Sequence, residues 1–383
     1  MCEHFGKCGG CTYLDISYEE ELSRKKIFLT ETLGEYAKFF NVLHPAPSCE
    51  GYRNKMEFAF GDEGKDGQLT LGIRKKRTFY EVATPTDCVL IHDDFKIIVQ
   101  CVISFFRENG ETFFHRKRHT GSLRHLVLRR GEFTGEILVL LSASSNLQTP
   151  LNLFAEKLLS LPLDGKITGI LHAENDGVAD AVKNENIQLL HGRDFYYEKI
   201  CGLKFKVSAF SFFQTNSRAA EILYGVVREF ADTGATALDM YCGTGTIAQI
   251  ISPDFQAVIG VELIEEAIMA ARENASQNNL TNCEFHAGDA FAILEKLPQS
   301  LSSDVIIVDP PRDGLHPKAL AKISALNAPR IIYVACKPKS LVRDLPTLID
   351  AGYALEKIEA VDMFPRTPHV EAIVLLQRAV GFI

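Results

Sequence analysis

The sequence predicts an α/β protein in which a doubly wound, mostly parallel sheet follows a β-rich region. From about residue 207 onward, short apolar runs alternate with helical segments, which is typical of a parallel sheet with crossover helices. The residues from about 42 to 205 instead contain strand-like runs broken by turn signals such as Gly61-Asp62 and Asp66-Gly67. A chain of 383 residues is long enough for two or three such domains.

Five short apolar runs in the C-terminal region are the expected parallel strands. The clearest helix between them runs from Ile264 to about Asn278. Two later runs, Leu355–Val361 and Val370–Gln377, are close enough in sequence to pair as an antiparallel hairpin. The five parallel strands are expected at Ala237–Tyr241, Ala257–Glu262, Cys283–His286, Asp304–Asp309 and Arg330–Ala335.

The remaining residues divide into a cysteine-rich N-terminal segment with a helix, residues 1–40, and a β-rich α+β central domain, residues 41–206. Roughly helical spacing of apolar residues predicts a helix over Tyr18–Phe40, and a second helix is expected near Leu151–Leu161. Residues 207–383 form the third expected domain. The clearest strands of the central domain are Met56–Phe60, Leu126–Leu128 and Glu136–Leu141.

Composition and charge limit the class of protein. Hydrophobic residues make up 46% and charged residues 23%, as in ordinary globular proteins. Neither a membrane-length apolar run nor a signal peptide is present, so we expect a cytoplasmic protein whose ten cysteines are reduced. The net charge of −8 argues against nonspecific coating of nucleic acid. The stretch Arg74–Arg130 nevertheless carries twelve basic against six acidic residues, which fits either a phosphate-binding strip or solvated loops.

A glycine-rich turn follows the first predicted strand of the C-terminal domain. The segment Asp239–Thr246 (Asp-Met-Tyr-Cys-Gly-Thr-Gly-Thr) opens a helix, and its glycines allow a ligand to approach the backbone closely. Glu262, at the end of the second strand, suits ribose hydroxyls. The pattern also meets the loose dinucleotide fingerprint, so a nicotinamide-dependent oxidoreductase is an alternative. The acid Asp239 inside the strand, and Asp289 within reach of an adenine amine, favour S-adenosylmethionine.

Two further strand ends carry groups that suit methyl transfer to carbon. Asp309–Arg312 (Asp-Pro-Pro-Arg) resembles the signature of amino-methylating enzymes, but Arg312 replaces the aromatic ring that stacks on a target base, which disfavours methylation of an exocyclic nitrogen. Cys336 follows the strand Arg330–Ala335, at the edge where open sheets bind ligands. A thiolate that adds to C6 of a pyrimidine makes C5 nucleophilic toward a methyl donor.

That reaction also needs a base to remove the C5 proton. Glu371, at the start of the last strand, is the expected base, and His369 ranks second. Lys337, next to Cys336, is expected to lower the pKa of the thiol if its amine points toward the sulfur.

The chain resembles the uridine-C5 RNA methyltransferases in five segments, which occur along the chain in the same order as in that family. The resemblance implies a Rossmann-like class I methyltransferase domain with Cys336 as nucleophile and Glu371 as base. The nucleophile segment departs from the family's usual Ser-Cys-Asn-Pro, because this chain has Ala-Cys-Lys-Pro. The implied S-adenosylmethionine residues are Gln214, Tyr241, Gly243, Glu262 and Asp289, with Asp309 at the methyl donor or the target uracil. The segments are Phe212–Asn216, Asp239–Gly243, Asp309–Arg312, Tyr333–Cys336 and Asp362–Glu371.

The first cysteines predict a metal site. Cys2, Cys8 and Cys11 are spaced as Cys-x5-Cys-Gly-Gly-Cys, and three close thiols in a reducing compartment need a fourth ligand. The resemblance implies that Cys88 is this ligand and that the site holds a [4Fe–4S] cluster, although zinc could occupy the same thiols. From the residues alone, the candidates for the fourth ligand are His4, Cys49, Cys88 and Cys101.

The resemblance also indicates which class of RNA is the substrate. Family members that modify one ribosomal site carry an RNA-binding β-barrel ahead of the cluster, and the transfer-RNA members generally lack the cluster. A chain that begins at the cluster resembles the shorter bacterial enzymes acting on large-subunit ribosomal RNA, so 23S rRNA is the expected substrate and tRNA the alternative. The target uridine must leave its stack to reach Cys336. We expect a monomer without an obligate protein partner; a non-catalytic iron–sulfur RNA-binding protein is the remaining alternative.

Overall fold

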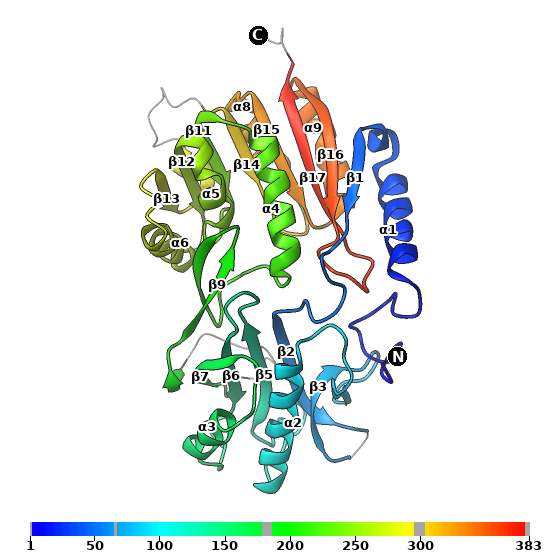
Figure 1. Ribbon diagram of the computed structural model, residues 1–383, viewed down its shortest axis with the longest axis vertical. Helices are drawn as coiled ribbons and strands as arrows, with labels where there is room; N and C mark the ends of the chain where they lie inside the picture. The colour runs from blue at the N-terminus through cyan, green and yellow to red at the C-terminus, as the bar shows by residue number, and fades with distance from the viewer. Residues whose placement is uncertain (1, 65–66, 178–185, 295–302, 380–383) are drawn as a thin grey trace.

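The computed structural model describes residues 2–64, 67–177, 186–294 and 303–379, and it contains two domains built around separate sheets (Figure 1). The α/β domain, at the top of Figure 1, is built on an eight-stranded sheet with helices on both faces. The central domain, below it, is built on a seven-stranded sheet. Every helix in the described ranges is too short or too polar to cross a membrane.

The sheet of the α/β domain has the strand order β1-β16-β17-β15-β14-β11-β12-β13. Neighbouring strands from β15 to β13 run parallel, and β17 lies antiparallel to both β15 and β16. The five predicted parallel strands and the antiparallel hairpin are therefore confirmed. Their bounds are β11 Gly234–Met240, β12 Phe255–Glu262, β13 Cys283–Ala287, β14 Val305–Val308, β15 Arg330–Ala335, β16 Tyr353–Val361 and β17 Glu371–Arg378.

Both faces of this sheet are buried because its strands are apolar on both sides. In β15, Ile332 and Val334 pack in the same core as α4, α5 and α6, whereas Ile331 and Tyr333 pack in the core that contains α1, α8 and α9. Continuous burial of this kind is typical of parallel strands covered by helices. The helices are α4 Ser217–Ala231, α5 Thr246–Ile251, α6 Glu265–Gln277, α7 Ala290–Leu294, α8 Pro317–Ala325 and α9 Pro338–Asp350.

The N-terminal helix belongs to the α/β domain and is shorter than predicted. The helix α1 spans Tyr18–Leu33 and ends at Gly34, whose φ of 57° is the left-handed geometry that often closes a helix. A 3₁₀ helix, Gly34–Phe39, leads into β1, Phe40–His44, which pairs in parallel with β16. Residues 41–44, which the sequence assigned to the central domain, thus extend the edge of the α/β sheet.

The central domain is mixed α and β, and one of its helices was not predicted. Its strand order is β4-β3-β2-β5-β6-β7-β8, with β6 and β7 parallel across the helix α3. The long helix α2 escaped prediction, although its apolar residues, including Phe95, Val99, Val102 and Phe106, recur at helical spacing and form the core under the sheet. The elements are β2 Lys55–Asp62, β3 Leu69–Arg74, β4 Val82–Ala83, α2 Asp93–Glu108, β5 Leu123–Arg130, β6 Glu136–Ala143, α3 Leu151–Leu159, β7 Lys166–Glu174 and β8 Ile187–Gly192.

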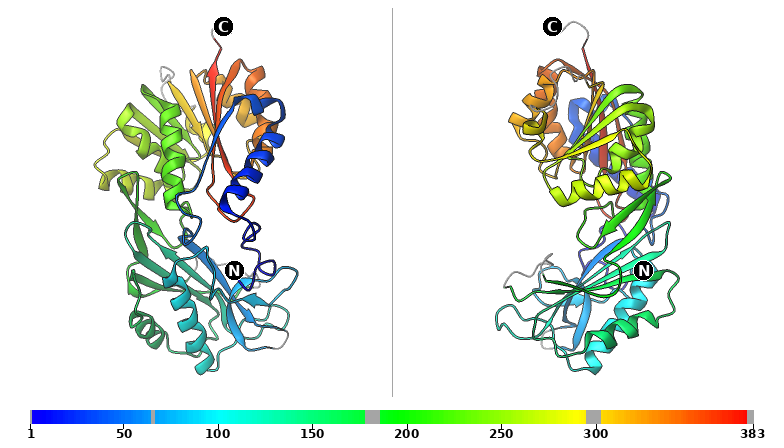
Figure 2. Two further views of the ribbon diagram at one scale, coloured as in Figure 1. Left: turned by 45° about the vertical axis from the view of Figure 1, so that its right-hand side comes forward. Right: turned by 90° about the vertical axis from the view of Figure 1, so that its left-hand side faces the viewer.

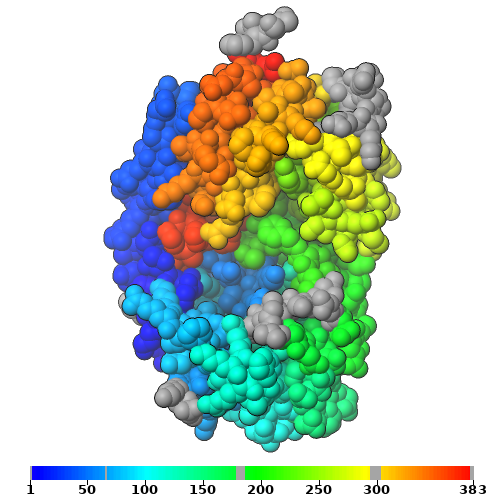
Figure 3. All heavy atoms as spheres, turned by 180° about the vertical axis from the view of Figure 1, so that it is seen from behind, coloured from blue at the N-terminus to red at the C-terminus, as the bar shows by residue number. Residues whose placement is uncertain are grey.

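The two domains meet around the segment that leads into α4. A two-stranded ribbon, β9 Phe195–Ile200 and β10 Leu203–Ser208, connects them. Asn54, next to β2, donates from Nδ2 to the carbonyl of Gln214 at 3.0 Å and to the hydroxyl of Ser217 at 2.8 Å. Viewed from behind, the molecule is hollowed between the two domains (Figure 3). In Figure 2 the segment that precedes α1 runs from that helix down to the central domain.

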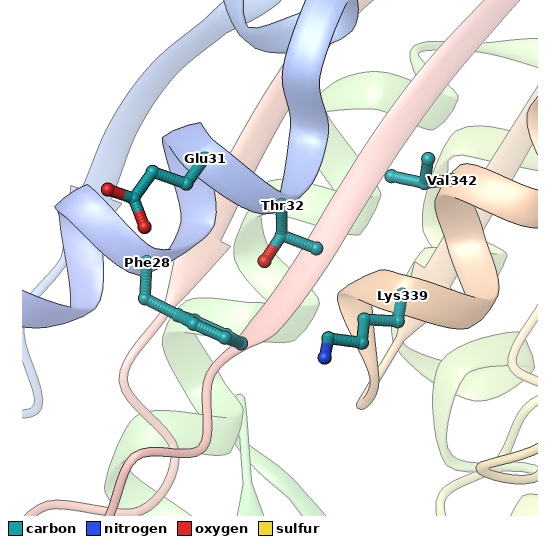
Figure 4. A pocket seen from close by; sticks show the side chains of 5 residues that line it. All are labelled: Phe28, Glu31, Thr32, Lys339 and Val342. Atoms are coloured by element: carbon teal, nitrogen blue, oxygen red, sulfur yellow. The ribbon is translucent and has the colours of Figure 1, made fainter.

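A shallow groove separates α1 from α9 on the outer face of the α/β domain. Its walls come from these two helices only, with a cavity volume of about 410 Å³. It contains none of the predicted site residues, and we assign it no role. The lining side chains are Phe28, Glu31, Thr32, Lys339 and Val342 (Figure 4).

A buried ion network ties α1 to the segment that follows β16. Lys25 is 1% exposed, and its Nζ lies 2.6 Å from Oε1 of Glu21 and 2.7 Å from Oδ1 of Asp362. The hydroxyl of Tyr18 donates to the other oxygen of Asp362 at 2.9 Å. The charge of Lys25 thus compensates two buried carboxylates. Removing this lysine would leave both carboxylates without a cation, which is strongly destabilising.

Replacing Lys25 by methionine should therefore destabilise the protein by about 3–5 kcal/mol, because two buried carboxylates lose their cation. Lys26→Met is the matched control, since Lys26 is exposed on the same helix, and it should change the free energy of unfolding by no more than ~0.5 kcal/mol. Chemical denaturation of both variants measures the difference. Equal effects of the two substitutions would contradict the role of the network.

Candidate active site

The predicted site residues line one edge of the α/β sheet. In the order β17, β15, β14, β11, β12, the strands bring Glu371, Cys336, Asp309, Tyr241 and Glu262 to this edge. Four of these residues follow or close the carboxyl end of a strand, whereas Glu371 begins an antiparallel strand. Ligands of open α/β sheets bind at this edge.

The strand register places Cys336 opposite Glu371. Ala335, the last residue of β15, pairs with Ala372 of β17, so the next pair in the antiparallel register is Cys336 with Glu371. Directly opposite residues point to the same face of a sheet, with Cβ atoms ~4.5–5.5 Å apart. Cys336 is half-buried and Glu371 is 4% exposed. The sequence-predicted thiol and carboxylate are therefore brought together.

Two carboxyl groups at this edge, those of Glu371 and Asp309, have raised pKa values. Burial, followed by the negative charge of Asp309, raises the pKa of Glu371 to about 8. Burial raises the pKa of Asp309 to about 7. Both groups therefore change charge near neutral pH, which is the range in which a carboxylate serves as a general base.

The pKa of Cys336 is raised, and Lys337 is not positioned to lower it. Burial is the main cause, the charges of Glu371 and Asp309 add to it, and Arg312 opposes them. The amine of Lys337 instead lies 4.0 Å from Asp313, and its side chain is about half exposed. The condition on the expected effect, an amine that points toward the sulfur, is not met, because adjacency in sequence does not decide which way a side chain points. The cation that acts on the thiol is Arg312, in the loop after β14.

His369, the second candidate base, lies outside the buried pair. It is exposed, and its ring contacts Phe364 edge-on at 6.4 Å between centroids. Burial of the ring, followed by the charges of Arg312 and Lys25, lowers the pKa of His369. Glu371 is therefore better placed than His369 to act beside Cys336.

The glycine-rich turn after β11 has the backbone shape that its sequence predicts. Tyr241, Gly243 and Gly245 all adopt positive φ angles, of 67°, 54° and 73°. A Cβ at Gly245 would approach the ring of Phe285 to 2.6 Å, so this position accepts only glycine without rearrangement. The pKa of the Tyr241 hydroxyl is raised by burial and then by the charges of Asp289 and Glu262, so these three predicted residues share one environment.

The acids around this turn shape its backbone. Glu262 accepts a hydrogen bond from the amide of Gly243 at 3.2 Å and from that of Leu263 at 2.9 Å. Asp289 accepts from the amide of Ala292 at 3.0 Å, at the start of α7. Asp239 accepts from the amide of Ala248 at 2.9 Å, while its other carboxylate oxygen is buried without a partner among the described residues. Burial raises the pKa of Asp239 to about 8.

Sequence reasoning missed Tyr224, a buried tyrosine on α4. Burial raises the pKa of its hydroxyl, the charges of Asp309 and Glu371 add to this, and a hydrogen bond with Gln214 opposes it. Tyr224 thus belongs to the same polar cluster as the predicted carboxylates. In sequence it is one apolar position of an amphipathic helix, and no local pattern separates it from the core.

The segment that carries Gln214 is fastened to the loop before β17. Asn216 caps α4 by accepting from the amide of Ala219 at 3.2 Å. Its Nδ2 donates to the carbonyl of Met363 at 3.1 Å. Gln214 is 7% exposed and follows directly from the junction with the central domain. These contacts therefore link the segment of Gln214, the predicted cofactor residue, to the loop that leads to Glu371, the predicted base.

The four cysteines predicted as metal ligands gather at one place. The pKa of Cys11 is raised by burial and then by the charges of Cys88, Cys8 and Cys2. Burial also raises the pKa of Cys2, and the charges of Cys88 and Cys8 add to this rise. Of the other candidates for the fourth ligand, Cys49 accepts a hydrogen bond from Arg366, His4 pairs with Glu3, and Cys101 has Lys157 and Glu108 as its charged neighbours.

The raised pKa of Glu371 predicts a pH dependence of stability. The folded state binds its proton more tightly than the unfolded chain does, so this group costs stability progressively as the pH rises from about 4.5 to about 8. Glu371→Gln should remove that cost and lose less stability than the wild type between pH 5 and pH 8.5. Glu356→Gln, at an exposed position of β16, is the matched control and should follow the wild type. Thermal unfolding across this range measures the slopes, and identical slopes for all three proteins would refute the assignment.

Comparison with known proteins identifies relatives over the whole chain. The family model described as tRNA (uracil-5-)-methyltransferase matches residues 180–379. A protein from Clostridium tetani described as an uncharacterized RNA methyltransferase is 44% identical over 384 residues, covering 98% of this chain and 83% of the relative. A second such protein, from Clostridium acetobutylicum, is 44% identical over 386 residues, covering 99% of this chain and 84% of the relative.

A solved structure has the same architecture. The tRNA (uracil-54, C5)-methyltransferase of Pyrococcus abyssi, in complex with S-adenosyl-L-homocysteine, is 29% identical, with a TM-score of 0.79, and the match covers 96% of this chain and 86% of that one. These relatives support neither the oxidoreductase nor the non-catalytic alternative. The chain belongs to the uridine-C5 RNA methyltransferase family and is an RNA methyltransferase.

Proposed function

We propose that this protein methylates C5 of a uridine in RNA through a covalent adduct between Cys336 and C6 of the uracil, with S-adenosylmethionine as methyl donor. The observation that carries the proposal is the register that puts Cys336 opposite Glu371, at the edge where the glycine-rich turn also lies. A thiol, a carboxylate and a ligand-binding turn at one strand edge are the groups that the reaction needs.

Each residue has a defined part in the reaction. Cys336 loses its thiol proton to solvent, and the thiolate Sγ forms a bond to C6 as the C5–C6 double bond opens. The electron pair at C5 then takes the methyl group, and the donor leaves as S-adenosylhomocysteine. Glu371 then accepts the proton from C5, the double bond re-forms, and the C6–S bond breaks to release the thiolate. Burial of Glu371 keeps it basic enough to take this proton near neutral pH, because its pKa is about 8.

The turn after β11 fits a nucleoside-bearing ligand. Its left-handed residues clear space beside the backbone, and Tyr241 lies near two carboxylates, Glu262 and Asp289, which suit ribose hydroxyls and an adenine amine. S-adenosylmethionine bound here supplies the methyl group and a positive sulfonium charge. We assign Gln214 and Asp309 to orienting the donor and the target base, and Gly243 to the close backbone approach.

We propose 23S rRNA as the substrate, since the cysteine set resembles that of the cluster-bearing ribosomal enzymes. Transfer RNA is the second candidate, favoured by the match to the Pyrococcus abyssi structure. In either RNA, the uridine has to leave its stack, because Cys336 is half-buried at the sheet edge. The hollow between the two domains could receive such a flipped base (Figure 3).

We further propose that Cys2, Cys8, Cys11 and Cys88 hold a [4Fe–4S] cluster. Burial raises the pKa values of Cys2, Cys11 and Cys88, and the charge of Cys8 adds to each of these rises, which supports a common site. No three of their sulfur atoms, among the described residues, lie within 4.8 Å of one another. The Cys-x5-Cys-Gly-Gly-Cys spacing with a distant fourth cysteine supports the cluster, and zinc is the alternative occupant of the same thiols. Bound there, the cluster would fasten residues 2–11 to the central domain.

The adduct is tested with RNA that contains 5-fluorouridine, together with S-adenosylmethionine. Fluorine cannot leave C5 as a proton does, so the wild-type enzyme should remain bonded to the RNA and migrate as a stable complex on a denaturing gel. Cys336→Ala should form none. Cys201→Ala is the control, because Cys201 is an exposed cysteine outside the site, and it should behave like the wild type.

Two transcripts, one of 23S rRNA and one of tRNA, make the same experiment discriminate between the substrates. We expect the complex with the ribosomal transcript. A complex with tRNA alone would reassign the substrate and keep the chemistry, whereas equal complex formation by wild type and Cys336→Ala would refute the adduct.

The cluster is tested by metal analysis of purified protein. Cys88→Ala should lose most of the bound iron together with the visible absorption of the cluster, because three thiols cannot complete the ligand set. Cys49→Ala is the matched control, since Cys49 lies near the segment but contacts Arg366 instead, and it should keep its iron. Zinc without iron in the wild type would replace the cluster by a zinc site.

A further inference from the structure

The loop between β16 and β17 is held by the cysteine-bearing segment at the N-terminus. The carbonyl of Arg366 accepts hydrogen bonds from the amides of Thr12 at 2.7 Å and Tyr13 at 3.2 Å, the residues directly after Cys11. In Figures 1 and 2 the N-terminal segment lies below α1, beside the loop that precedes β17. This loop ends at Glu371.

The backbone of Arg366 is strained and depends on these partners. Its φ is 68°, a left-handed conformation that non-glycine residues rarely adopt. Its amide donates to Oε1 of Glu21 at 2.7 Å, the same carboxylate that pairs with the buried Lys25. The conformation therefore persists because contacts from residues 12–13 and from α1 over-determine it.

The side chain of Arg366 reaches toward the cysteine site. Its guanidinium donates to the carbonyl of Ile16 at 3.3 Å and lies 3.4 Å from the sulfur of Cys49. Arg366 thus contacts the chain just after Cys11 through both its side chain and its backbone, and its backbone belongs to the loop that precedes Glu371.

We propose that Arg366 is a positioning residue that couples occupancy of the thiol site to the placement of Glu371. The inference rests on the proposed roles of the cysteines and of Glu371. With Cys11 held as a ligand, the amides of Thr12 and Tyr13 would stay on the carbonyl of Arg366. Without that restraint the amides would be freed, the left-handed residue would relax, and Glu371, five positions later, would lose its place.

The coupling acts on one step of the reaction. Cys336 directly follows β15, which is held between β14 and β17 and, among the described residues, makes no backbone hydrogen bond to the N-terminal segment. Glu371 is reached through the loop. Disturbing Arg366 should therefore slow removal of the C5 proton and release of the adduct, while leaving attack by Cys336 nearly unchanged.

Hydrogen exchange measured by mass spectrometry on the full-length protein tests the coupling directly. In iron-loaded wild type, amides of residues 363–371 should be protected; chelation of the iron should raise their exchange rate about tenfold, as for loss of two hydrogen bonds. Arg366→Ala should show the faster exchange while keeping its iron. Arg228→Ala, which removes a surface pair with Asp254, is the control and should leave the loop unchanged.

A second readout separates positioning from general loss of structure. On ordinary RNA, Arg366→Ala should accumulate adduct, as Glu371→Gln should if Glu371 is the base, whereas the trapping rate of Arg366→Ala on 5-fluorouridine RNA should stay within about twofold of the wild type. Equal loss of trapping and release would overturn the proposal, and so would loop exchange that is indifferent to iron and to Arg366. Iron content is measured on every sample: a wild type without metal refutes the thiol site, whereas metal with an unaltered loop refutes only the coupling.

Discussion

The insertion of β17 between β15 and β16 is the constraint on which the rest of the active site depends. Because β17 runs against its neighbours, its first residue arrives at the edge where β15 ends, and Glu371 meets Cys336 there. A parallel β17 would carry Glu371 to the opposite edge, about 23 Å away, because the eight residues of the strand are separated by seven steps of ~3.3 Å. The antiparallel strand is thus what turns a ligand-binding sheet edge into a site with both a nucleophile and a base.

Burial of that pair has an electrostatic consequence. With Asp309 beside them, the groups share a space from which water is largely excluded, so each holds its proton more tightly than it would in solvent. A raised pKa suits Glu371 as a base but works against thiolate formation at Cys336. Arg312 is the nearby protein cation that opposes this rise, and the sulfonium charge of a bound methyl donor would act in the same direction.

The surroundings of the pair come from three parts of the chain. The central domain supplies Asn54, which holds the carbonyl of Gln214, and the N-terminal helix supplies Lys25, which holds Asp362. Asn216 joins the segment of Gln214 to the loop before β17. The catalytic edge is therefore also the junction of the domains, so contacts far from Cys336 in sequence can affect the base that serves it.

The sequence by itself determined where strands stop and what chemistry stands there. Cys336, Asp309, Glu262 and the glycine-rich turn were all found because an apolar run and the residue that ends it are local features. Even the pairing of the last two strands followed from their closeness along the chain. Family resemblance then supplied the reaction that links them.

Only the tertiary structure decided which side chains share an environment. In the structure, Tyr224 on α4 lies near the carboxylates of Asp309 and Glu371. The amine of Lys337 lies near Asp313, and Arg312 is the cation that acts on the thiol of Cys336. The tertiary structure also showed that β1 lies at the edge of the α/β sheet and not in the central domain. The hydrogen bonds from residues 12–13 to the carbonyl of Arg366 were likewise found only there. These outcomes depend on packing between segments distant in sequence, whose directions no local periodicity encodes.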